Sequence, residues 1–265
     1  MKRKATVIDG RSLAQRWSDD IAVEVRALDA PIGLAAVCVE GNAALRSFVK
    51  LKEKAAHEVG IQFSSYFIDP RDRTGAGELL RFLASDESVH GIFIELPLPH
   101  EWDDAGDILA LIPPEKDVDA LTLHPLVPAP AARALRYVLE AHDIATQGIV
   151  AVVVGHGRLV GRPIAQELRD AGATVHVIDI DTAEPAQRSS TADLIVTGVG
   201  KANLITSDWV KEGATVIDFG YADGHGDVDM DSVKQKAGLL TPVPGGMGPL
   251  VVAAVLENLV ALAVR

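Results

Sequence analysis

Runs of apolar residues alternate with amphipathic stretches along most of this chain. The apolar runs predict buried strands at residues 33–39, 61–68, 91–96, 150–154, 174–178, 193–197 and 214–218. Between them, apolar residues recur every three or four positions at 11–28, 43–59, 74–85, 131–141 and 161–170, which predicts helices. Because parallel strands need such crossover connections, the alternation predicts an α/β fold with parallel sheets whose faces are covered.

A proline-rich segment interrupts this pattern near the middle of the chain. Five prolines fall between residues 113 and 130, and prolines at this density break regular structure. We therefore expect the hinge between two α/β domains here, with one domain at 1–122 and a second at 123–245. An apolar helix at 246–265 follows, and residues 181–191 are predicted to form a loop.

The second domain contains the most informative stretch, residues 150–179. An apolar run ends in Gly155-His156-Gly157, Gly161 opens a helical pattern, and Asp179 ends the next apolar run. Glycines let the backbone approach a pyrophosphate, and an acid about 20 residues later suits a ribose 2′-hydroxyl. The stretch predicts a dinucleotide site, although such turns also close βαβ units that bind nothing.

Ligands of open parallel sheets bind beyond the carboxyl ends of the strands, and several glycine-rich segments of the second domain fall there. The predicted cofactor-binding residues are Gly155, His156, Gly157, Val160, Gly161, Asp179, Gly198, Val199, Gly200 and Gly220.

Composition excludes several classes of function. The chain of 265 residues has a formal net charge of −12, and so acidic a surface repels nucleic acid. The single cysteine, Cys38, excludes an internal disulfide, and the histidines show no metal-ligand spacing, so we predict no metal site. The longest apolar stretch, 250–264, is too short to span a bilayer, so we expect a cytoplasmic protein without a membrane partner.

Two charged residues of the first domain are candidates for chemistry. Glu95 ends an apolar run, where an uncompensated charge is costly. Lys52 lies in the predicted helix 43–59, where a solvated charged face is the simpler interpretation.

Eight segments in order along the chain resemble one enzyme family. They are FVKLKEKAAHEVGI, GIFIELPLP, PPEKDVDA, VVVGHGRLVGRP, ADLIVTGVGK, VIDFGY, GDVD and TPVPGGMGP, of which the last is the most specific. Through them the chain resembles the bifunctional methylenetetrahydrofolate dehydrogenase/methenyltetrahydrofolate cyclohydrolase family over essentially its whole length. The resemblance implies a folate-binding catalytic domain at 1–122, an NAD(P)-binding Rossmann domain at 123–245, a last helix returning to the first domain, and a homodimer.

The resemblance also implies two linked reactions on tetrahydrofolate derivatives. Hydride passes from 5,10-methylenetetrahydrofolate to a nicotinamide, and water then opens the methenyl product to 10-formyltetrahydrofolate. The implied catalytic residues are Lys52, Glu95 and Asp119. The implied substrate-binding residues are Phe48, Lys52, Leu96, Pro97, Asp119, Pro244, Gly245 and Gly246. In this scheme Phe48 stacks on the folate, Asp119 binds the pterin and Lys52 serves the hydrolytic step.

On the substrate side the chain departs from the family at three positions, one of which is Leu45, in place of a serine usually found shortly before the tyrosine. Phe48 stands in place of a tyrosine, and Glu95 in place of the glutamine that tunes the lysine. A carboxylate beside Lys52 favours its ammonium form, which cannot act as a general base. We therefore expect weak or absent cyclohydrolase activity, or a pocket adapted to a different reduced pterin.

The cofactor side departs as well. His156 replaces the arginine that meets the 2′-phosphate of NADP in the family, and Gly157 replaces the serine after it. Asp179 and Ile180 stand in place of a histidine and a serine. An acid at this strand end accepts hydrogen bonds from a ribose 2′-hydroxyl and repels a 2′-phosphate, so NAD is expected to be preferred over NADP.

Three functions are compatible with the sequence. The first is a folate-dependent, NAD(P)-linked dehydrogenase with doubtful cyclohydrolase activity. The second is an oxidoreductase of the same fold acting on a different pterin or one-carbon carrier, and the third is a catalytically impaired folate-binding paralogue. The presence of Lys52, Asp119 and the Pro-Gly-Gly-Met-Gly-Pro segment favours the first.

Overall fold

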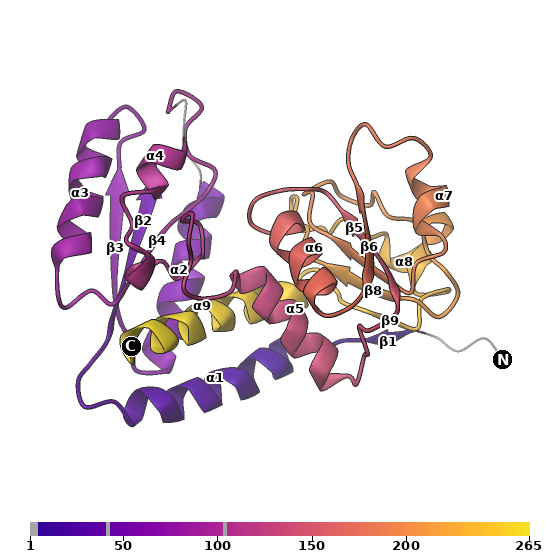
Figure 1. The fold of residues 1–265 in the computed structure, drawn as a ribbon, viewed down its shortest axis with the longest axis horizontal. Helices are drawn as coiled ribbons and strands as arrows, with labels where there is room; N and C mark the ends of the chain where they lie inside the picture. Colours follow the sequence, from indigo (N-terminus) through magenta and orange to yellow (C-terminus); the bar gives the residue numbers. More distant parts are fainter. Residues whose placement is uncertain (1–4, 41–42, 103–104) are drawn as a thin grey trace. The chain divides into compact units, whose positions relative to one another are not determined.

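The computed structural model describes residues 5–40, 43–102 and 105–265, and their contacts divide the chain into two compact units (Figure 1). The six-stranded unit combines the chain up to Ala14 with Ala131–Val251. The three-stranded unit combines Gln15–Pro130 with Val252–Arg265. The contacts of residues 5–14 lie with the six-stranded unit.

The three-stranded unit is built on a parallel sheet in the order β3-β2-β4. Its strands are β2 (Gly33–Val39), β3 (Gln62–Ile68) and β4 (Gly91–Ile94). Its helices are α2 (Ala43–Glu58), α3 (Arg73–Ser85), α4 (Ala105–Leu109) and the 3-10 turn η1 (Pro114–Lys116). Two longer helices, α1 (Gly10–Arg26) and α9 (Met247–Ala263), have residues in both units.

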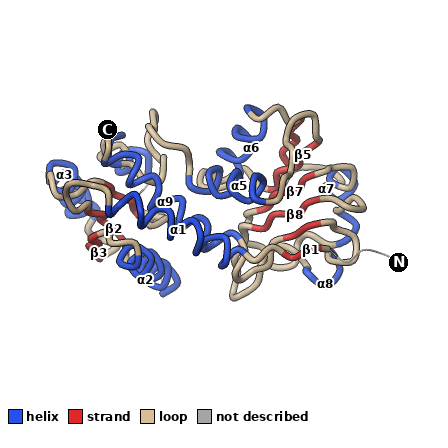
Figure 2. The backbone as a smooth tube through the Cα atoms, turned by 90° about the horizontal axis from the view of Figure 1, so that it is seen from below, coloured by secondary structure: helices blue, strands red, loops and turns tan. Residues whose placement is uncertain are grey.

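Successive side chains of β2 and β4 point to opposite faces of this sheet, so alternate residues contact different helices. Val37 of β2 and Ile94 of β4 belong to a core cluster with Leu80 and Leu83 of α3. Phe93 lies between two such inward positions, so its side chain points to the opposite face. Figures 1 and 2 show α2 and α3 on opposite faces of the sheet, and Phe93 therefore faces the helix that carries Lys52.

The six-stranded unit is built on a parallel sheet in the order β1-β9-β8-β7-β5-β6 (Figure 2). Its strands are β1 (Thr6–Val7), β5 (Val150–Val154), β6 (Thr174–Ile178), β7 (Leu194–Thr197), β8 (Thr215–Asp218) and β9 (Leu239–Leu240). Its helices are α5 (Pro130–Ala141), α6 (Gly161–Asp170), α7 (Pro185–Ser189), η2 (Ser207–Trp209) and α8 (Met230–Val233).

Helices cover both faces of this larger sheet. Val152 of β5 packs in a cluster with Trp209 and Val233, and Ala186 of α7 lies against it. The opposite face receives α6, which packs on β5 and β6, and Figure 1 shows α6 on one side and α7 and α8 on the other. The chain leaves β5 for β6 on one side and then returns to β7 on the other, so the topological switch point lies at β5.

The structure corrects several local predictions. The strand expected at 91–96 ends at Ile94, so Glu95 lies beyond the strand end. The loop expected at 181–191 contains the short helix α7, whose first residue is Pro185. A proline is well suited to a first helical position because its ring fixes φ and no N–H is needed there. In the described part of the chain, no helix is long and apolar enough to cross a membrane.

Candidate active site

Lys52 and Glu95 form an ion pair on the face of the three-stranded sheet that α2 covers. The Lys52 Nζ atom donates to Glu95 Oε1 over 2.7 Å, and both side chains are largely shielded from solvent, at 13% and 10% exposed. The same Nζ atom lies 4.0 Å from the centroid of the Phe93 ring. A carboxylate and the face of an aromatic ring each attract a cation, so both contacts engage the charged end of Lys52.

Asp119 belongs to the same cluster of charges. It follows η1 in a turn, and burial raises the pKa of its carboxyl group to about 6. Lys52 opposes that shift, whereas the carboxylates of Glu95 and Asp117 reinforce it. The structure thus brings together the three residues that were expected to be catalytic, Lys52, Glu95 and Asp119, in one unit.

Two residues that sequence reasoning missed hold the turn that carries Asp119. Asp117 is buried, and its carboxylate accepts a hydrogen bond of 2.7 Å from the Thr122 N–H group. Asn258 of α9 is also buried, and its amide donates to the Val118 carbonyl over 2.8 Å and to the Pro128 carbonyl over 2.9 Å. The signal for Asn258 was its place in an otherwise apolar helix, where a buried amide needs partners.

The expected substrate-binding residues of this unit lie around the cluster. Phe48 precedes Lys52 by one helical turn on α2, so the two side chains share a face of the helix, and the Phe48 ring is 38% exposed. Leu96 and Pro97 follow Glu95 directly and are joined by a cis peptide bond. An exposed aromatic ring beside buried charges suits a flat heterocycle with polar edges.

In the six-stranded unit, the turn after β5 is shaped by its glycines. Gly155 has a φ of +94°, and a Cβ atom on Gly161 would lie 2.2 Å from the Gly155 carbonyl oxygen. The start of α6 therefore packs directly on the turn, behind the half-buried Val160. His156 and Gly157 are exposed, and a Cβ atom on Gly157 would meet nothing within 4 Å. The turn is open on its outer side, as a pyrophosphate requires.

Asp179 stands at the carboxyl end of β6, beside this turn. Its Oδ1 atom accepts hydrogen bonds from the Thr182 hydroxyl at 2.7 Å and from the Asp181 N–H group at 3.2 Å. The Thr182 hydroxyl is the main reason that the pKa of Asp179 is lowered, so the side chain is a carboxylate near neutral pH. Ile180, the next residue, is 98% exposed.

The other expected cofactor residues occupy neighbouring strand ends. Gly198, Val199 and Gly200 follow β7, and Gly220 follows β8. The pairing of β5 with β7 places the loop after β7 next to the glycine turn, and a Cβ atom on Gly155 would lie 2.5 Å from Val199 Cγ1. All ten expected cofactor residues therefore lie at the carboxyl edge of β5, β6, β7 and β8.

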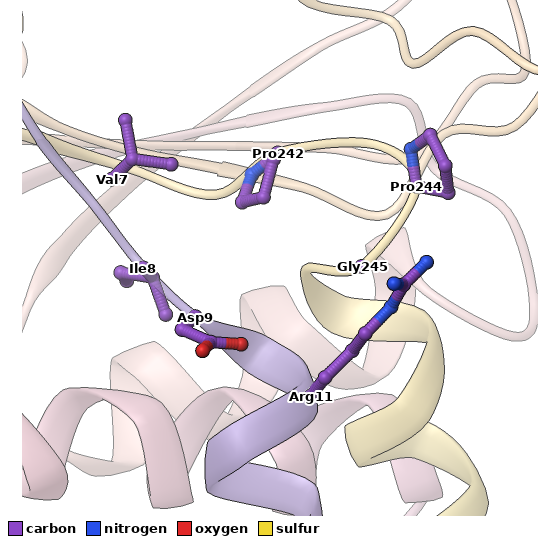
Figure 3. Close-up of a pocket in the computed structure, with 7 residues that line it drawn as sticks. All are labelled: Val7, Ile8, Asp9, Arg11, Pro242, Pro244 and Gly245. Atoms are coloured by element: carbon purple, nitrogen blue, oxygen red, sulfur yellow. The ribbon is translucent and has the colours of Figure 1, made fainter.

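Two of the three remaining expected substrate residues line a pocket of about 310 Å³ in the same unit (Figure 3). Pro244 and Gly245 border it together with Asp9 and Arg11, and Figure 3 shows the Arg11 side chain extending toward Gly245. Gly246 is buried just behind, since a Cβ atom on it would lie 2.3 Å from the Pro242 carbonyl oxygen. The structure therefore places Pro244–Gly246 in a different unit from Lys52 and Asp119.

A parallel sheet whose switch point carries an open glycine turn places this chain in the class of dinucleotide-binding α/β proteins. Comparison with protein families narrows that class. The catalytic domain of tetrahydrofolate dehydrogenase/cyclohydrolase matches residues 8–119, and the NAD(P)-binding domain of the same enzyme matches residues 129–265. The chain belongs to the tetrahydrofolate dehydrogenase/cyclohydrolase family.

Individual relatives agree with this assignment. The bifunctional protein FolD of Burkholderia ambifaria is 39% identical over 280 residues, which cover 98% of each chain. The crystal structure of the bifunctional FolD enzyme of Campylobacter jejuni has a TM-score of 0.91 at 34% identity and covers 98% of both chains. The FolD enzyme of Trypanosoma brucei, solved with NADP and an inhibitor, has a TM-score of 0.94 at 29% identity and covers 99% of both.

Proposed function

We propose that this chain oxidises 5,10-methylenetetrahydrofolate to 5,10-methenyltetrahydrofolate with NAD(P) in one-carbon metabolism. The observation that carries the proposal is the Lys52–Glu95 pair with Asp119, in a chain whose whole length belongs to the family. In this proposal residues 1–122 with the helix 246–265 bind the folate, and residues 123–245 bind the dinucleotide. A cytoplasmic location and the absence of nucleic-acid and membrane partners remain part of the proposal.

The residues have distinct tasks in this reaction. The dinucleotide accepts the hydride, so the protein mainly supplies geometry. Phe48 offers its exposed ring to the pterin, and the Asp119 carboxylate accepts hydrogen bonds from the polar edge of that ring system. The glycine turn at Gly155–Gly161 and the α6 N-terminus hold the pyrophosphate.

Turnover by the purified chain tests the proposal. Mixing it with 5,10-methylenetetrahydrofolate and NAD or NADP should reduce the nicotinamide with a kcat of about 1–10³ s⁻¹. Asp119→Ala should raise the KM for the folate about tenfold, because a charge-assisted hydrogen bond contributes about 1.5–3 kcal/mol, and should leave the KM for the cofactor unchanged. Binding of the folate without turnover would contradict the proposal and favour a catalytically impaired paralogue.

For the cofactor we propose a preference for NAD. The support is the carboxylate of Asp179 at the end of β6, together with His156 in place of the arginine expected in the family. For the second reaction we propose that hydrolysis is slow, since the Lys52 Nζ atom is engaged by the Glu95 carboxylate and the Phe93 ring rather than free to move a proton. A pocket adapted to a different reduced pterin remains the alternative.

We also propose that the chain forms a homodimer, and the supporting observation is the free edge of the three-stranded sheet. Among the described strands β3 pairs with β2 alone. The Gln62 N–H group donates to Ile32 and the Ile68 carbonyl accepts from Glu40, so alternate residues bond toward β2. The backbone groups of Ser65 therefore point outward, where a second copy can add a strand.

The oligomeric state checks this edge directly. Light scattering coupled to size-exclusion chromatography should report a dimer for the wild type and a monomer for Ser65→Pro, because proline removes an outward N–H group. Ser65→Ala keeps that N–H group and should remain dimeric. A monomeric wild type, or a folded Ser65→Pro variant that stays dimeric, would disprove assembly through β3.

A further inference from the structure

The loop that follows β7 is fixed from behind by one buried carboxylate. Asp227 is fully buried, and its Oδ2 atom accepts hydrogen bonds from the Thr197 hydroxyl at 2.8 Å and from the Val199 N–H group at 2.7 Å. Its Oδ1 atom accepts from the Lys201 N–H group at 2.7 Å. One side chain thus binds the end of β7 and two main-chain groups of the loop.

A second buried acid extends this arrangement to the next strand end. Asp218 accepts hydrogen bonds from the Gly220 N–H group at 2.7 Å and from the Val228 N–H group at 2.9 Å. Gly220 leaves room for Asp227, since a Cβ atom there would lie 2.2 Å from the Asp227 Cγ atom. Hydrogen bonds to two adjacent carboxylates therefore hold the loops after β7 and β8.

The loop held in this way faces the glycine turn. Val199, Gly200 and Lys201 are exposed, so the hydrogen bonds to Asp227 do not serve to bury them. The Val199 side chain lies against Gly155, where a Cβ atom would approach Val199 Cγ1 to 2.5 Å. Holding the Val199 main chain therefore also holds one side of the glycine turn at the switch point. Residues that contact a ligand directly keep their positions only if other residues pack and hydrogen-bond against them.

We propose that Asp227 is a positioning residue for the dinucleotide, because its carboxylate holds the Val199–Lys201 main chain in the shape that receives the cofactor. This inference rests on the proposed NAD(P)-dependent function and names a residue that acts on the cofactor only through the loop. Asparagine cannot replace this carboxylate, because its side chain has one acceptor oxygen and one NH₂ group. At least one of the three groups that donate hydrogen bonds to Asp227 would then face another donor. Burying a carboxylate is costly, and the three hydrogen bonds offset that cost.

The test is the affinity of the full-length chain for NADH, measured by isothermal titration calorimetry. Asp227→Asn should raise the Kd at least about tenfold, the loss expected for a charge-assisted hydrogen bond. The KM for the dinucleotide should rise in parallel, while kcat and the KM for the folate stay within about twofold, a split that general destabilisation would not produce. Asp229→Asn is the matched control, because Asp229 lies in the same segment but caps α8 through the Asp231 N–H group.

Each result either supports or overturns the positioning role of Asp227. A folded Asp227→Asn variant with the Kd of the wild type overturns the inference, while a wild type that binds no dinucleotide overturns the proposed function itself. If Asp227→Asn does not fold, Thr197→Val removes one of the three donors with little change in volume. That variant should weaken NADH binding about threefold, and an unchanged Kd there overturns the inference as well.

Discussion

Oxidation of 5,10-methylenetetrahydrofolate by this chain is expected to be about 100-fold more efficient with NAD than with NADP, compared as kcat/KM. Family members have an arginine at the position of His156, and that arginine would supply a charge-assisted hydrogen bond to the 2′-phosphate, worth about 1.5–3 kcal/mol. Asp179 adds repulsion, because the Thr182 hydroxyl keeps its pKa low and the carboxylate ionised. The 2′-phosphate of NADP would therefore meet a carboxylate where the family has a cation, so its desolvation has no compensating partner.

Substitutions at the end of β6 should shift this preference. Asp179→Ser removes the repulsion and supplies a hydroxyl, so it should raise kcat/KM for NADP about tenfold and lower that for NAD. The control is Asp181→Ser, which removes a nearby acid whose only described contact with Asp179 is through its backbone N–H group. Kinetics with both dinucleotides over a range of concentrations give the comparison, and equal or better use of NADP by the wild type would refute the preference.

Arg158 provides a second test of the same idea. It is exposed two residues after His156 in the glycine turn. If Arg158 substituted for that arginine, Arg158→Ala would selectively reduce activity with NADP. We expect instead an equal loss with both dinucleotides, since an arginine at this turn meets the pyrophosphate that NAD and NADP share.

The larger elements could be predicted from the sequence because each contains a recognisable local pattern of apolar residues. The run at 150–154 is apolar throughout and coincides with β5, and the run at 174–178 coincides with β6. The two-residue strands β1 and β9 had no comparable signal, since a strand needs several alternating positions before its pattern can be recognised. Likewise, the five residues of α7 make too few turns for a helical period.

Contacts between distant residues could be anticipated only where the family resemblance named them. The resemblance linked Lys52 with Glu95, which the structure joins at 2.7 Å, but nothing in the sequence indicated that Phe93 lies against the same ammonium group. Nor did the GDVD segment indicate that Asp227 holds a loop at a strand end 28 residues away. Such pairings follow from sheet order and side-chain direction, which composition and periodicity do not specify.

The identity of residue 95 should control the second reaction. Wild-type chain is expected to hydrolyse 5,10-methenyltetrahydrofolate at least about tenfold more slowly than it oxidises the methylene compound. A proton-transfer catalyst contributes about 10²–10⁴-fold, and a lysine whose Nζ atom is paired with Glu95 against the Phe93 ring forfeits much of that contribution. Glu95→Gln keeps the size and one acceptor oxygen but removes the charge, so it should raise the hydrolysis rate about tenfold or more.

Glu58→Gln is the matched control for that substitution. Glu58 pairs with Lys54 on the same helix at 3.7 Å, but both side chains are exposed, so removing that carboxylate should leave both rates unchanged. Reduction of NAD by each variant shows that the active site is intact. If the wild type already hydrolysed as fast as it oxidised, or if Glu95→Gln retained oxidation without gaining hydrolysis, the charge at residue 95 would not limit the lysine. The slow step would then lie with the missing hydroxyl at Phe48, and Phe48→Tyr would be the variant that accelerates hydrolysis.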